Sequence, residues 1–546
     1  MSELKPLRGQ GKRGTVFSGW VRSLSGPAVV FAAPVQFSLA GVEWARPERA
    51  QIEVRARSVG GTWSRWVSAS VLGHDADGGE GAKAAQYGEP IWFGPCDAVA
   101  LRSAAPVEGV SVHFVATAAP GGRAAETAAR SVAGAAGALP LATPRLDAGP
   151  GQPPIIARSA WAGDDNGPAY PPTYGDVRMA FVHHTDNPNG YAAQDVPAML
   201  LAIYDYHRYV RGWFDIGYNF VIDLYGRMWE ARAGGIDQAV VGAQAGGYNL
   251  ESTGVAMLGT FSDVVPTQTA MNALEHLLAW KLALHGVPVL GKVTVEVNPA
   301  DAFYTPFAPG AHVSLPRVAG HRDGCTTDCP GNALYAQLPS VRPIVNRLAG
   351  TAVALSLNVK GQRNWPAAYL SPAGAQIVAG EPLSLSGRLA ALDGPGQGGE
   401  SIELQSVRGD GAEAVLGEAM TGSDGSWSTT LSPAANLLLR ALHAIAPAAA
   451  SPLVAVAVAP ALTLQVVSEA PLRVGGTVTP AKARVAIDVY DARGHHKLEH
   501  AATVTGSDGR FEARLNLRSG HYWVRAHTAA DGQNIAGESP RLTLTV

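Results

Sequence analysis

Residues 320 to 331 place the tightest constraint on how this chain can fold. They read Gly-His-Arg-Asp-Gly-Cys-Thr-Thr-Asp-Cys-Pro-Gly and carry two metal donors, the imidazole of His321 and the thiol of Cys329. Nitrogen and thiolate donors together suit zinc, and the glycines allow the loop to fold back on itself. Because two protein ligands do not hold zinc, the fold has to bring a third donor beside this loop.

The best candidate for the third donor lies at the end of an apolar run, residues 179 to 185, which read Met-Ala-Phe-Val-His-His-Thr. This run predicts a strand, and neighbouring side chains of a strand point to opposite faces. Either His183 or His184 therefore faces the loop, but not both. Three protein ligands and one open position are typical of a catalytic zinc rather than a structural zinc.

Four motifs follow one another in an order that resembles a known family. They are Phe-Val-His-His-Thr (181 to 185), Arg-Gly-Trp-Phe-Asp-Ile-Gly-Tyr-Asn-Phe (211 to 220), Gly-Tyr-Asn-Leu-Glu-Ser-Thr-Gly-Val-Ala-Met-Leu-Gly (247 to 259), and Gly-His-Arg-Asp with Cys-Pro-Gly (within 320 to 331). In this order they resemble the peptidoglycan recognition protein and type 2 amidase family, which also contains phage amidase-type lysozymes. The resemblance covers about residues 155 to 345.

The resemblance implies a zinc enzyme. By this likeness the Zn²⁺ ligands are His183, His321 and Cys329, and Tyr218 and Thr327 line the reacting centre. The implied reaction is hydrolysis of the amide bond between N-acetylmuramic acid and L-alanine in bacterial peptidoglycan and its muropeptides. We expect the Tyr218 hydroxyl to help hold the attacking water or the oxyanion. Thr327 either hydrogen-bonds the substrate carbonyl or only shapes the loop, and the sequence leaves both alternatives open.

We expect four further residues to contact the substrate: Asn219, Gln244, Tyr248 and Asn249. Gln244 departs from the family pattern, because this chain has Gly-Ala-Gln-Ala at 242 to 245 where many relatives have Gly-Ala-His-Ala. A glutamine can hydrogen-bond, but it does not titrate near neutral pH. This argues against a proton-transfer role at that position.

Two other classes of function compete with the enzyme hypothesis. The first is a peptidoglycan receptor that binds without cutting; non-catalytic family members lack the cysteine ligand, so Cys329 favours the enzyme. The second is a wall-associated adhesin in which the β-rich modules are the functional part. A strained disulfide between Cys325 and Cys329 is a rival interpretation of the loop, and it would remove the thiolate donor.

Charge and hydropathy exclude several partners. With 42 basic and 45 acidic residues the net charge is −3, so we expect no nucleic-acid partner. The sequence contains no run of eighteen or more strongly apolar residues, so we predict no transmembrane helix. Residues 23 to 42 are uncharged, but Gly26, Pro27 and Pro34 interrupt them, so we predict a strand there rather than the core of a signal peptide. From the family resemblance we expect a secreted or cell-wall-associated protein.

At 546 residues the chain is too long for one core, so we predict several domains. Thr-Gly-Ser-Asp-Gly occurs at 421 to 425 and again at 505 to 509, and an aromatic residue, Trp427 or Phe511, follows each copy. This repeat predicts two similar small β modules. The expected domains are a β-rich N-terminal module (1 to 117), a linker rich in Ala, Gly and Pro (118 to 154), the zinc amidase domain (155 to 350), and two immunoglobulin-like β-sandwich modules (352 to 457 and 460 to 546).

The expected fold of the amidase domain is a mixed β-sheet flanked by helices. Periodicity predicts strands at 177 to 185, 218 to 223, 227 to 231 and 252 to 261, helices at 194 to 211, 267 to 286 and 332 to 348, and an inserted loop at 287 to 316. His207 falls on the apolar helix face and is predicted to be a packed core histidine, not a ligand. Because its core signals are self-contained, we expect residues 153 to 350 to fold and act alone.

Overall fold

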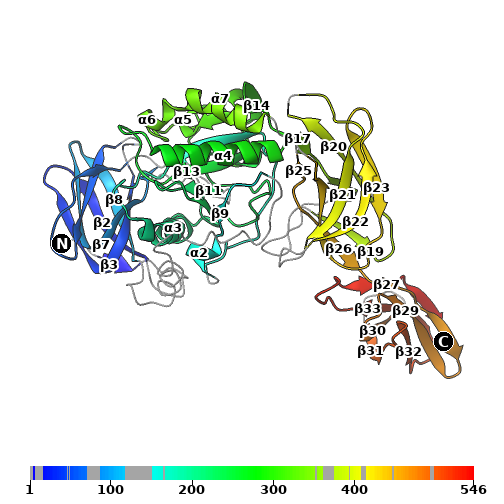
Figure 1. Cartoon of the computed structure of the whole chain (residues 1–546). Helices are drawn as coiled ribbons and strands as arrows, with labels where there is room; N and C mark the ends of the chain where they lie inside the picture. The colour runs from blue at the N-terminus through cyan, green and yellow to red at the C-terminus, as the bar shows by residue number, and fades with distance from the viewer. Residues whose placement is uncertain are drawn as a thin grey trace.

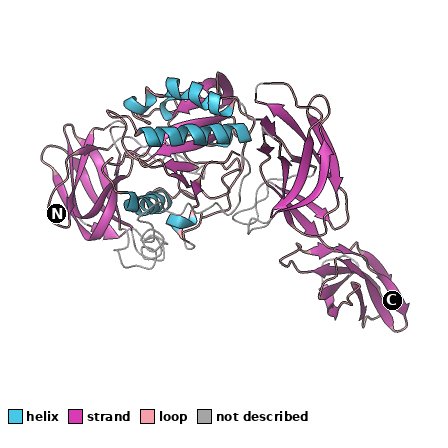
Figure 2. Ribbon diagram, in the orientation of Figure 1, coloured by secondary structure: helices cyan, strands magenta, loops and turns pink. Residues whose placement is uncertain are grey.

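The computed structural model describes most of the chain as modules that follow one another in sequence order (Figure 1). Helices lie in the central part, and the parts on either side are built from strands (Figure 2). No helix among the described residues is long and apolar enough to cross a membrane. The described residues are 4 to 6, 16 to 45, 47, 50 to 69, 86 to 116, 151 to 163, 166 to 350, 353 to 360, 374 to 392, 394 to 407, 413 to 445, 448 to 491 and 497 to 546.

The N-terminal module is an eight-stranded antiparallel sheet around its own apolar core. Residues 23 to 42 fall largely in two of its strands, which agrees with the strand prediction for this stretch. In β4 the side chains alternate between the two faces of the sheet, and Ile52, Val54 and Ala56 are buried. The strands are β1 (Leu4–Pro6), β2 (Val16–Leu24), β3 (Val29–Trp44), β4 (Ile52–Ser58), β5 (Val67–Ser68), β6 (Gln86–Tyr87), β7 (Ile91–Ser103) and β8 (Val107–Val115).

The central domain is built on a six-stranded mixed sheet, as predicted. The strand order is β16-β10-β13-β11-β12-β9, and only the β11–β12 pair is antiparallel. The four apolar runs therefore formed strands, although each is shorter than expected. The strands are β9 (Ile155–Ile156), β10 (Met179–His184), β11 (Phe220–Ile222), β12 (Met228–Glu230), β13 (Ser252–Met257) and β16 (Val318–Gly320).

Helices cover both faces of this sheet (Figure 1). On one face α4 (Gln268–Leu284) and α7 (Leu338–Ala349) pack with the inward side chains of β10 and β13. On the other face lie α2 (Ser159–Ala162) and α3 (Val196–Asp205), which continues into a π-helical turn at Tyr206–Val210. The hydroxyl of Thr267 accepts a hydrogen bond from the Ala270 N–H, so it caps α4 where the sequence predicted the helix to begin.

Two expectations for the central domain were wrong. Residues 287 to 316 are not an irregular loop, because β14 (Lys292–Glu296) and β15 (His312–Pro316) pair as an antiparallel hairpin. The alternation of buried Val293 and Val295 with exposed neighbours is the signal that was missed. The last helix is also divided into α6 (Asn332–Tyr335) and α7, because Pro339 has no N–H to continue a helix and suits a first turn.

Each of the two C-terminal modules is made of two sheets. Trp427 pairs with Gly387 in the first module, and Phe511 pairs with Gly476 in the second, so the repeated motif occupies the same place in both. Their immunoglobulin-like class stays a prediction. The strands are β17 (Val353–Leu355), β18 (Asn358–Val359), β19 (Gly374–Val378), β20 (Leu383–Ala391), β21 (Ser401–Val407), β22 (Glu413–Met420), β23 (Ser426–Leu431), β24 (Leu437–His443), β25 (Ala449–Ala450) and β26 (Val454–Ala459), then β27 (Ala461–Leu462), β28 (Gln465–Glu469), β29 (Leu472–Thr479), β30 (Arg484–Asp491), β31 (Lys497–Val504), β32 (Arg510–Arg514), β33 (His521–Thr528), β34 (Gly537–Glu538) and β35 (Leu542–Thr545).

The N-terminal module shares an apolar core with the central domain. Val16, Leu39 and Val115 of its sheet belong to the same buried cluster as Met199 and Tyr206 of the α3 region. Burial of apolar surface between two modules stabilises their association in proportion to the area removed from water. The two modules are therefore packed together, and not only joined by the predicted linker, most of which (residues 118 to 150) lies outside the described residues.

Candidate metal centre

Two parallel strands bring the first two donors together. In the pairing of β10 with β16, Val182 lies opposite Gly320, so the next residues, His183 and His321, stand side by side where the strands end. Their rings are 4.5 Å apart between centroids. The chain then turns through α5 (His321–Gly324), and the Arg322 N–H donates a hydrogen bond to the Cys329 carbonyl at 3.1 Å. This bond closes the loop and returns Cys329 to the histidines.

The ligand atoms of His183, His321 and Cys329 all lie within 4.8 Å of one another. Sγ of Cys329 is 3.7 Å from Nδ1 of His183, and the three residues are 0%, 0% and 3% exposed. Mixed nitrogen and sulfur donors in this number fit zinc with one position left for water or substrate. Cys325 is a free, buried thiol that donates to the Gly246 carbonyl at 3.7 Å, so the rival disulfide does not form in this structure.

A hydrogen bond fixes the orientation of His183. Its Nε2 donates to Oε1 of Gln244 at 2.6 Å, and Nε2 of Gln244 donates to the Ser252 hydroxyl at 2.8 Å. This leaves Nδ1 of His183 as the atom that faces Cys329. Burial lowers the pKa of His183 to about 3, so the imidazole is neutral, as a metal ligand must be. His184 points to the opposite face, where its Nδ1 accepts a hydrogen bond from the Phe261 N–H.

Backbone and hydroxyl groups hold Cys329 in place. The His184 N–H donates to its sulfur at 3.4 Å, and its own N–H donates to the Thr327 hydroxyl at 3.2 Å. Burial raises the pKa of the Cys329 thiol well above its ordinary value. A bound cation reverses this preference, because it stabilises the thiolate directly. Binding of a metal ion at this site would therefore be coupled to release of the thiol proton.

The structure places both predicted catalytic residues beside the three donors. The ring of Tyr218 is 5.4 Å from that of His183, and burial raises the pKa of its hydroxyl well above the ordinary value. Tyr218 is therefore a neutral hydrogen-bond donor. The Thr327 hydroxyl accepts the Cys329 N–H, which is the loop-shaping alternative; a contact with substrate stays a prediction.

The four residues expected to contact substrate are buried and take part in internal hydrogen bonds. The Asn219 amide joins the Gly254 N–H to the Val240 carbonyl, and Asn249 accepts bonds from the Gln244 and Ala245 N–H groups. The Tyr248 hydroxyl meets that of Thr305 at 3.1 Å. These bonds give Asn219, Tyr248 and Asn249 a role in the walls of the site, and Gln244 a role in holding His183. Their contact with substrate stays a prediction.

Two carboxyl groups near the centre were missed by the sequence analysis. Asp186 follows β10 with a left-handed φ of 54°, and Glu89 comes from the N-terminal module. Both side chains are buried, and burial followed by the charge of Asp186 raises the pKa of Glu89 well above its ordinary value. No sequence signal links Glu89 to the metal motifs. His207, by contrast, is the packed histidine that was predicted, with its ring stacked on Trp213 and its Nδ1 accepting the Gly217 N–H.

Asp488, His500 and His527 also lie close enough together to hold a metal, in the last module. There the ammonium of Lys497 is already 2.7 Å from a carboxylate oxygen of Asp488, and Nδ1 of His500 contacts the same oxygen at 2.6 Å. His500 is half exposed, so the cluster resembles a surface ion-pair network. The cluster around Cys329 is the stronger metal candidate.

Comparison with known proteins agrees with this geometry. Residues 173 to 332 match the family model of N-acetylmuramoyl-L-alanine amidases, and residues 21 to 132 match that of the Rv3811 N-terminal galactose-binding domain-like family. The chain is 28% identical over 167 residues to peptidoglycan-recognition protein LB of Drosophila melanogaster, which covers 30% of this chain and 60% of the relative. It is 28% identical over 157 residues to the N-acetylmuramoyl-L-alanine amidase of Mus musculus, covering 28% of this chain and 24% of that one.

The chain thus spans less than two thirds of either of these relatives. It spans 87% of peptidoglycan-recognition protein 2 of Holotrichia diomphalia, with 30% identity over 192 residues, or 35% of this chain. The match to the amidase family model covers the region that carries His183, His321 and Cys329. This chain belongs to the family of peptidoglycan-recognition proteins and N-acetylmuramoyl-L-alanine amidases.

Proposed function

We propose that this protein is a zinc-dependent N-acetylmuramoyl-L-alanine amidase that cuts the bond between N-acetylmuramic acid and L-alanine in bacterial peptidoglycan. The observation that carries the proposal is the buried cluster of His183, His321 and Cys329, whose ligand atoms lie within 4.8 Å of one another. Such a cluster of unlike donors suits a catalytic zinc. It lies inside the region that matches the amidase family.

Zinc bound by these residues supplies a Lewis acid that lowers the pKa of a water molecule to about 7 and polarises a carbonyl. The protein's own groups do the rest of the work. Gln244 holds His183 in the tautomer that presents Nδ1 to the cluster. The neutral hydroxyl of Tyr218 is available to donate a hydrogen bond to the oxyanion that develops on the scissile carbonyl.

The competing function is a receptor that binds peptidoglycan without cutting it. A receptor needs walls that fit the glycan and peptide, but it does not need three converging metal donors. The presence of Cys329, and the hydrogen bonds that hold its sulfur and its N–H, therefore support the enzyme. Secretion or attachment to the wall, a targeting role for the β modules, and the immunoglobulin-like class of the last two belong to the same proposal.

The test is to incubate purified full-length protein with isolated cell wall and with soluble muropeptides, then to analyse the products by mass spectrometry. We expect intact glycan strands, released stem peptides with a free L-alanine amine, and about one zinc per chain. Cys329→Ser is the matched inactive variant. Tight binding to wall material without any released peptide, in the zinc-loaded protein, would establish the receptor and refute the enzyme.

A further inference from the structure

The N-terminal module is held against the metal-binding domain by close packing and by a shared apolar core. Gly41 of β3 packs so closely on the ring of Tyr206 that a Cβ at this position would come within 2.2 Å of it. Leu39 of the same strand shares a buried apolar cluster with the α3 region. Close packing and a shared core disfavour separation of the modules, because separation would expose this apolar surface to water.

A short segment of the N-terminal module, between β6 and β7, is held at both ends by the metal-binding domain. The Tyr206 hydroxyl donates to the Gly88 carbonyl at 3.4 Å, and the Trp92 N–H donates to Oδ1 of Asn187 at 2.7 Å. The guanidinium of Arg211 stacks 3.6 Å from the centre of the Tyr87 ring. Glu89 lies between these anchors, so the position of its backbone is set by the metal-binding domain.

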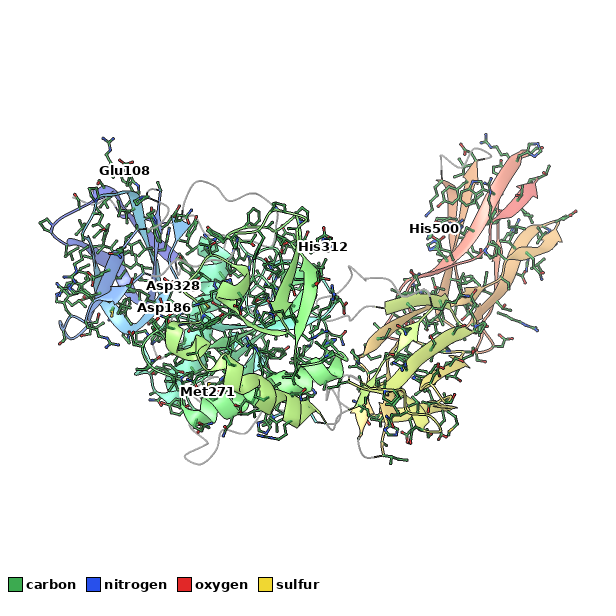
Figure 3. The ribbon with its side chains drawn as sticks, turned by 90° about the horizontal axis from the view of Figure 1, so that it is seen from above. Glu108, Asp186, Met271, His312, Asp328 and His500 are labelled. Carbon is green, nitrogen blue, oxygen red and sulfur yellow. The ribbon has the colours of Figure 1, made fainter. Side chains whose placement is uncertain are left out.

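The Glu89 side chain is buried where the N-terminal module meets the central domain. It is 1% exposed. Burial is the main reason that the pKa values of Tyr218 and Cys329 are raised, and the negative charge of Glu89 is the next in both cases. A charge that acts on both residues lies near the cluster. Asp186, which also acts on both, lies where the N-terminal module borders the central domain (Figure 3).

Two buried carboxyl groups among the described residues could carry the proton, Asp186 of the metal-binding domain and Glu89 of the N-terminal module, and the charge of Glu89 acts more strongly than that of Asp186 on both Tyr218 and Cys329. Amide hydrolysis removes a proton from water and delivers one to the leaving nitrogen. His183 and His321 are assigned to the metal, Gln244 does not titrate, and the hydroxyl of Tyr218 keeps its proton. Burial raises the pKa of Glu89, and a cation bound by the three donors would favour its charged form, so that the carboxyl group can take up a proton and return it.

We propose that the N-terminal module completes the active site, and that Glu89 is the acid–base residue of the amidase. The inference rests on the proposed function. In this reaction an O–H bond of the attacking water breaks and its proton passes to the Glu89 carboxylate, while the water oxygen bonds to the carbonyl carbon. The C–N bond then breaks, and Glu89 returns the proton to the departing nitrogen of L-alanine. The second proton of the water stays on the new carboxyl group and then passes to the amine, so the products are a carboxylate on the muramic acid and an ammonium group on the peptide.

The test compares Glu89→Gln with Glu53→Gln in the full-length, zinc-loaded protein. Both substitutions remove one carboxylate from the N-terminal module, but Glu53 pairs with Arg102 on an exposed part of the sheet. We expect Glu89→Gln to keep its zinc content and its affinity for muropeptides while kcat falls by about 100-fold or more. Glu53→Gln should match the wild type in all three measurements.

Chemical rescue separates a proton carrier from a structural residue. In Glu89→Ala, added formate or azide should restore part of the lost kcat, because a small anion can occupy the vacated space and accept the proton; the same anions should not raise the activity of the wild type. Unchanged kcat in Glu89→Gln, or loss of zinc or of folding together with activity, would overturn the inference while leaving the proposed function intact. A wild-type protein that holds zinc but cuts no muropeptide would refute the proposed function itself.

Discussion

Nε2 of His183 donates a hydrogen bond to Oε1 of Gln244 at 2.6 Å, and both side chains are completely buried. Gln244 in turn donates to Ser252, so its amide can present only its oxygen to the histidine. The residue at which this chain departs from the family pattern therefore orients His183, a proposed metal ligand. Accepting the His183 N–H requires a correctly placed oxygen and no change of charge, so a glutamine can fill this role.

Replacing Gln244 with methionine should weaken zinc binding. Methionine has nearly the same shape, but it has no strong acceptor for the His183 N–H, so the ring loses the bond that fixes its tautomer and orientation. Loss of such a partner typically lowers metal affinity by about 10-fold to 100-fold. Competition with a chromophoric chelator measures the affinity. Gln244→Glu keeps the acceptor and should bind zinc better than Gln244→Met; equal affinity in the wild type and Gln244→Met would contradict the assigned role.

Cys329 and Cys325 provide a matched pair of substitutions. Cys329→Ser should lose most of the zinc and nearly all hydrolysis, because a serine hydroxyl stays protonated near neutral pH and is a weaker donor. Cys325→Ser should keep both, since Cys325 bonds to the Gly246 carbonyl away from the three donors. Binding of peptidoglycan by Cys329→Ser should stay within about tenfold of the wild type, or about 1.4 kcal/mol. The reverse pattern, with Cys325→Ser as the inactive variant, would show that the wrong cysteine was assigned.

Substitutions of Thr327 can distinguish whether its hydroxyl shapes the loop or contacts the substrate. Thr327→Val removes the acceptor for the Cys329 N–H, and an unsatisfied N–H in a buried loop costs about 1 to 3 kcal/mol. We expect zinc affinity to fall in Thr327→Val and to persist in Thr327→Ser, which keeps the hydroxyl. Zinc titration measures the affinity of each variant for the metal, and steady-state kinetics measure its kcat. If Thr327→Val binds zinc normally and loses only kcat, the hydroxyl acts on the substrate instead.

Lys281 gives the stability of the central domain a specific pH dependence. Its ammonium is 2% exposed and donates to the Ile236 and Gln238 carbonyls, and burial lowers its pKa to about 7. Unfolding returns the pKa to about 10.4. Between these values the unfolded chain binds more protons than the folded one, so the unfolding free energy rises with pH, by up to about 1.4 kcal/mol per unit.

Lys281→Met should therefore lose this rise. Denaturant unfolding of the wild type and the variant at several pH values between 7 and 10 measures the difference. Comparing the two proteins at each pH removes the contribution of every other group. A difference that does not change with pH would mean that Lys281 keeps its ordinary pKa in the folded protein.

The cluster of His183, His321 and Cys329 was readable from the sequence because its residues lie at the ends of locally encoded elements. An apolar run that ends in His183, and a glycine-rich loop after a second strand, specify the cluster once the two strands are parallel neighbours. Side-chain alternation left His183 and His184 equivalent, and the family resemblance selected His183. The structure shows why, since His184 points into the opposite face of the sheet.

The parts that could not be read depend on contacts between distant segments. Glu89 lies in a different module, and nothing in its local sequence indicates that Asn187 and Tyr206 hold its segment against the metal centre. The hydrogen bond between Gln244 and His183 was also not readable, because the orientation of a buried amide is decided by Ser252 and His183 together. The β14–β15 hairpin, by contrast, had a readable alternation that its proline-rich surroundings obscured.

A fragment of residues 153 to 350 tests how far the central domain is independent. The self-contained core signals predicted that this fragment would fold and cut alone. The structure changes that expectation, because removal of the N-terminal module exposes the apolar side chains around Met199 and Tyr206 and takes Glu89 away from the metal centre. We expect the fragment to bind zinc through its own three donors, to associate or aggregate through the exposed patch, and to cut muropeptides much more slowly than a fragment of residues 1 to 350.

Zinc analysis measures the metal content of the fragment, light scattering measures its association, and muropeptide turnover measures its activity. Equal turnover by two soluble fragments would show that the N-terminal module takes no part in the chemistry and would restore the simpler view of a self-sufficient catalytic domain.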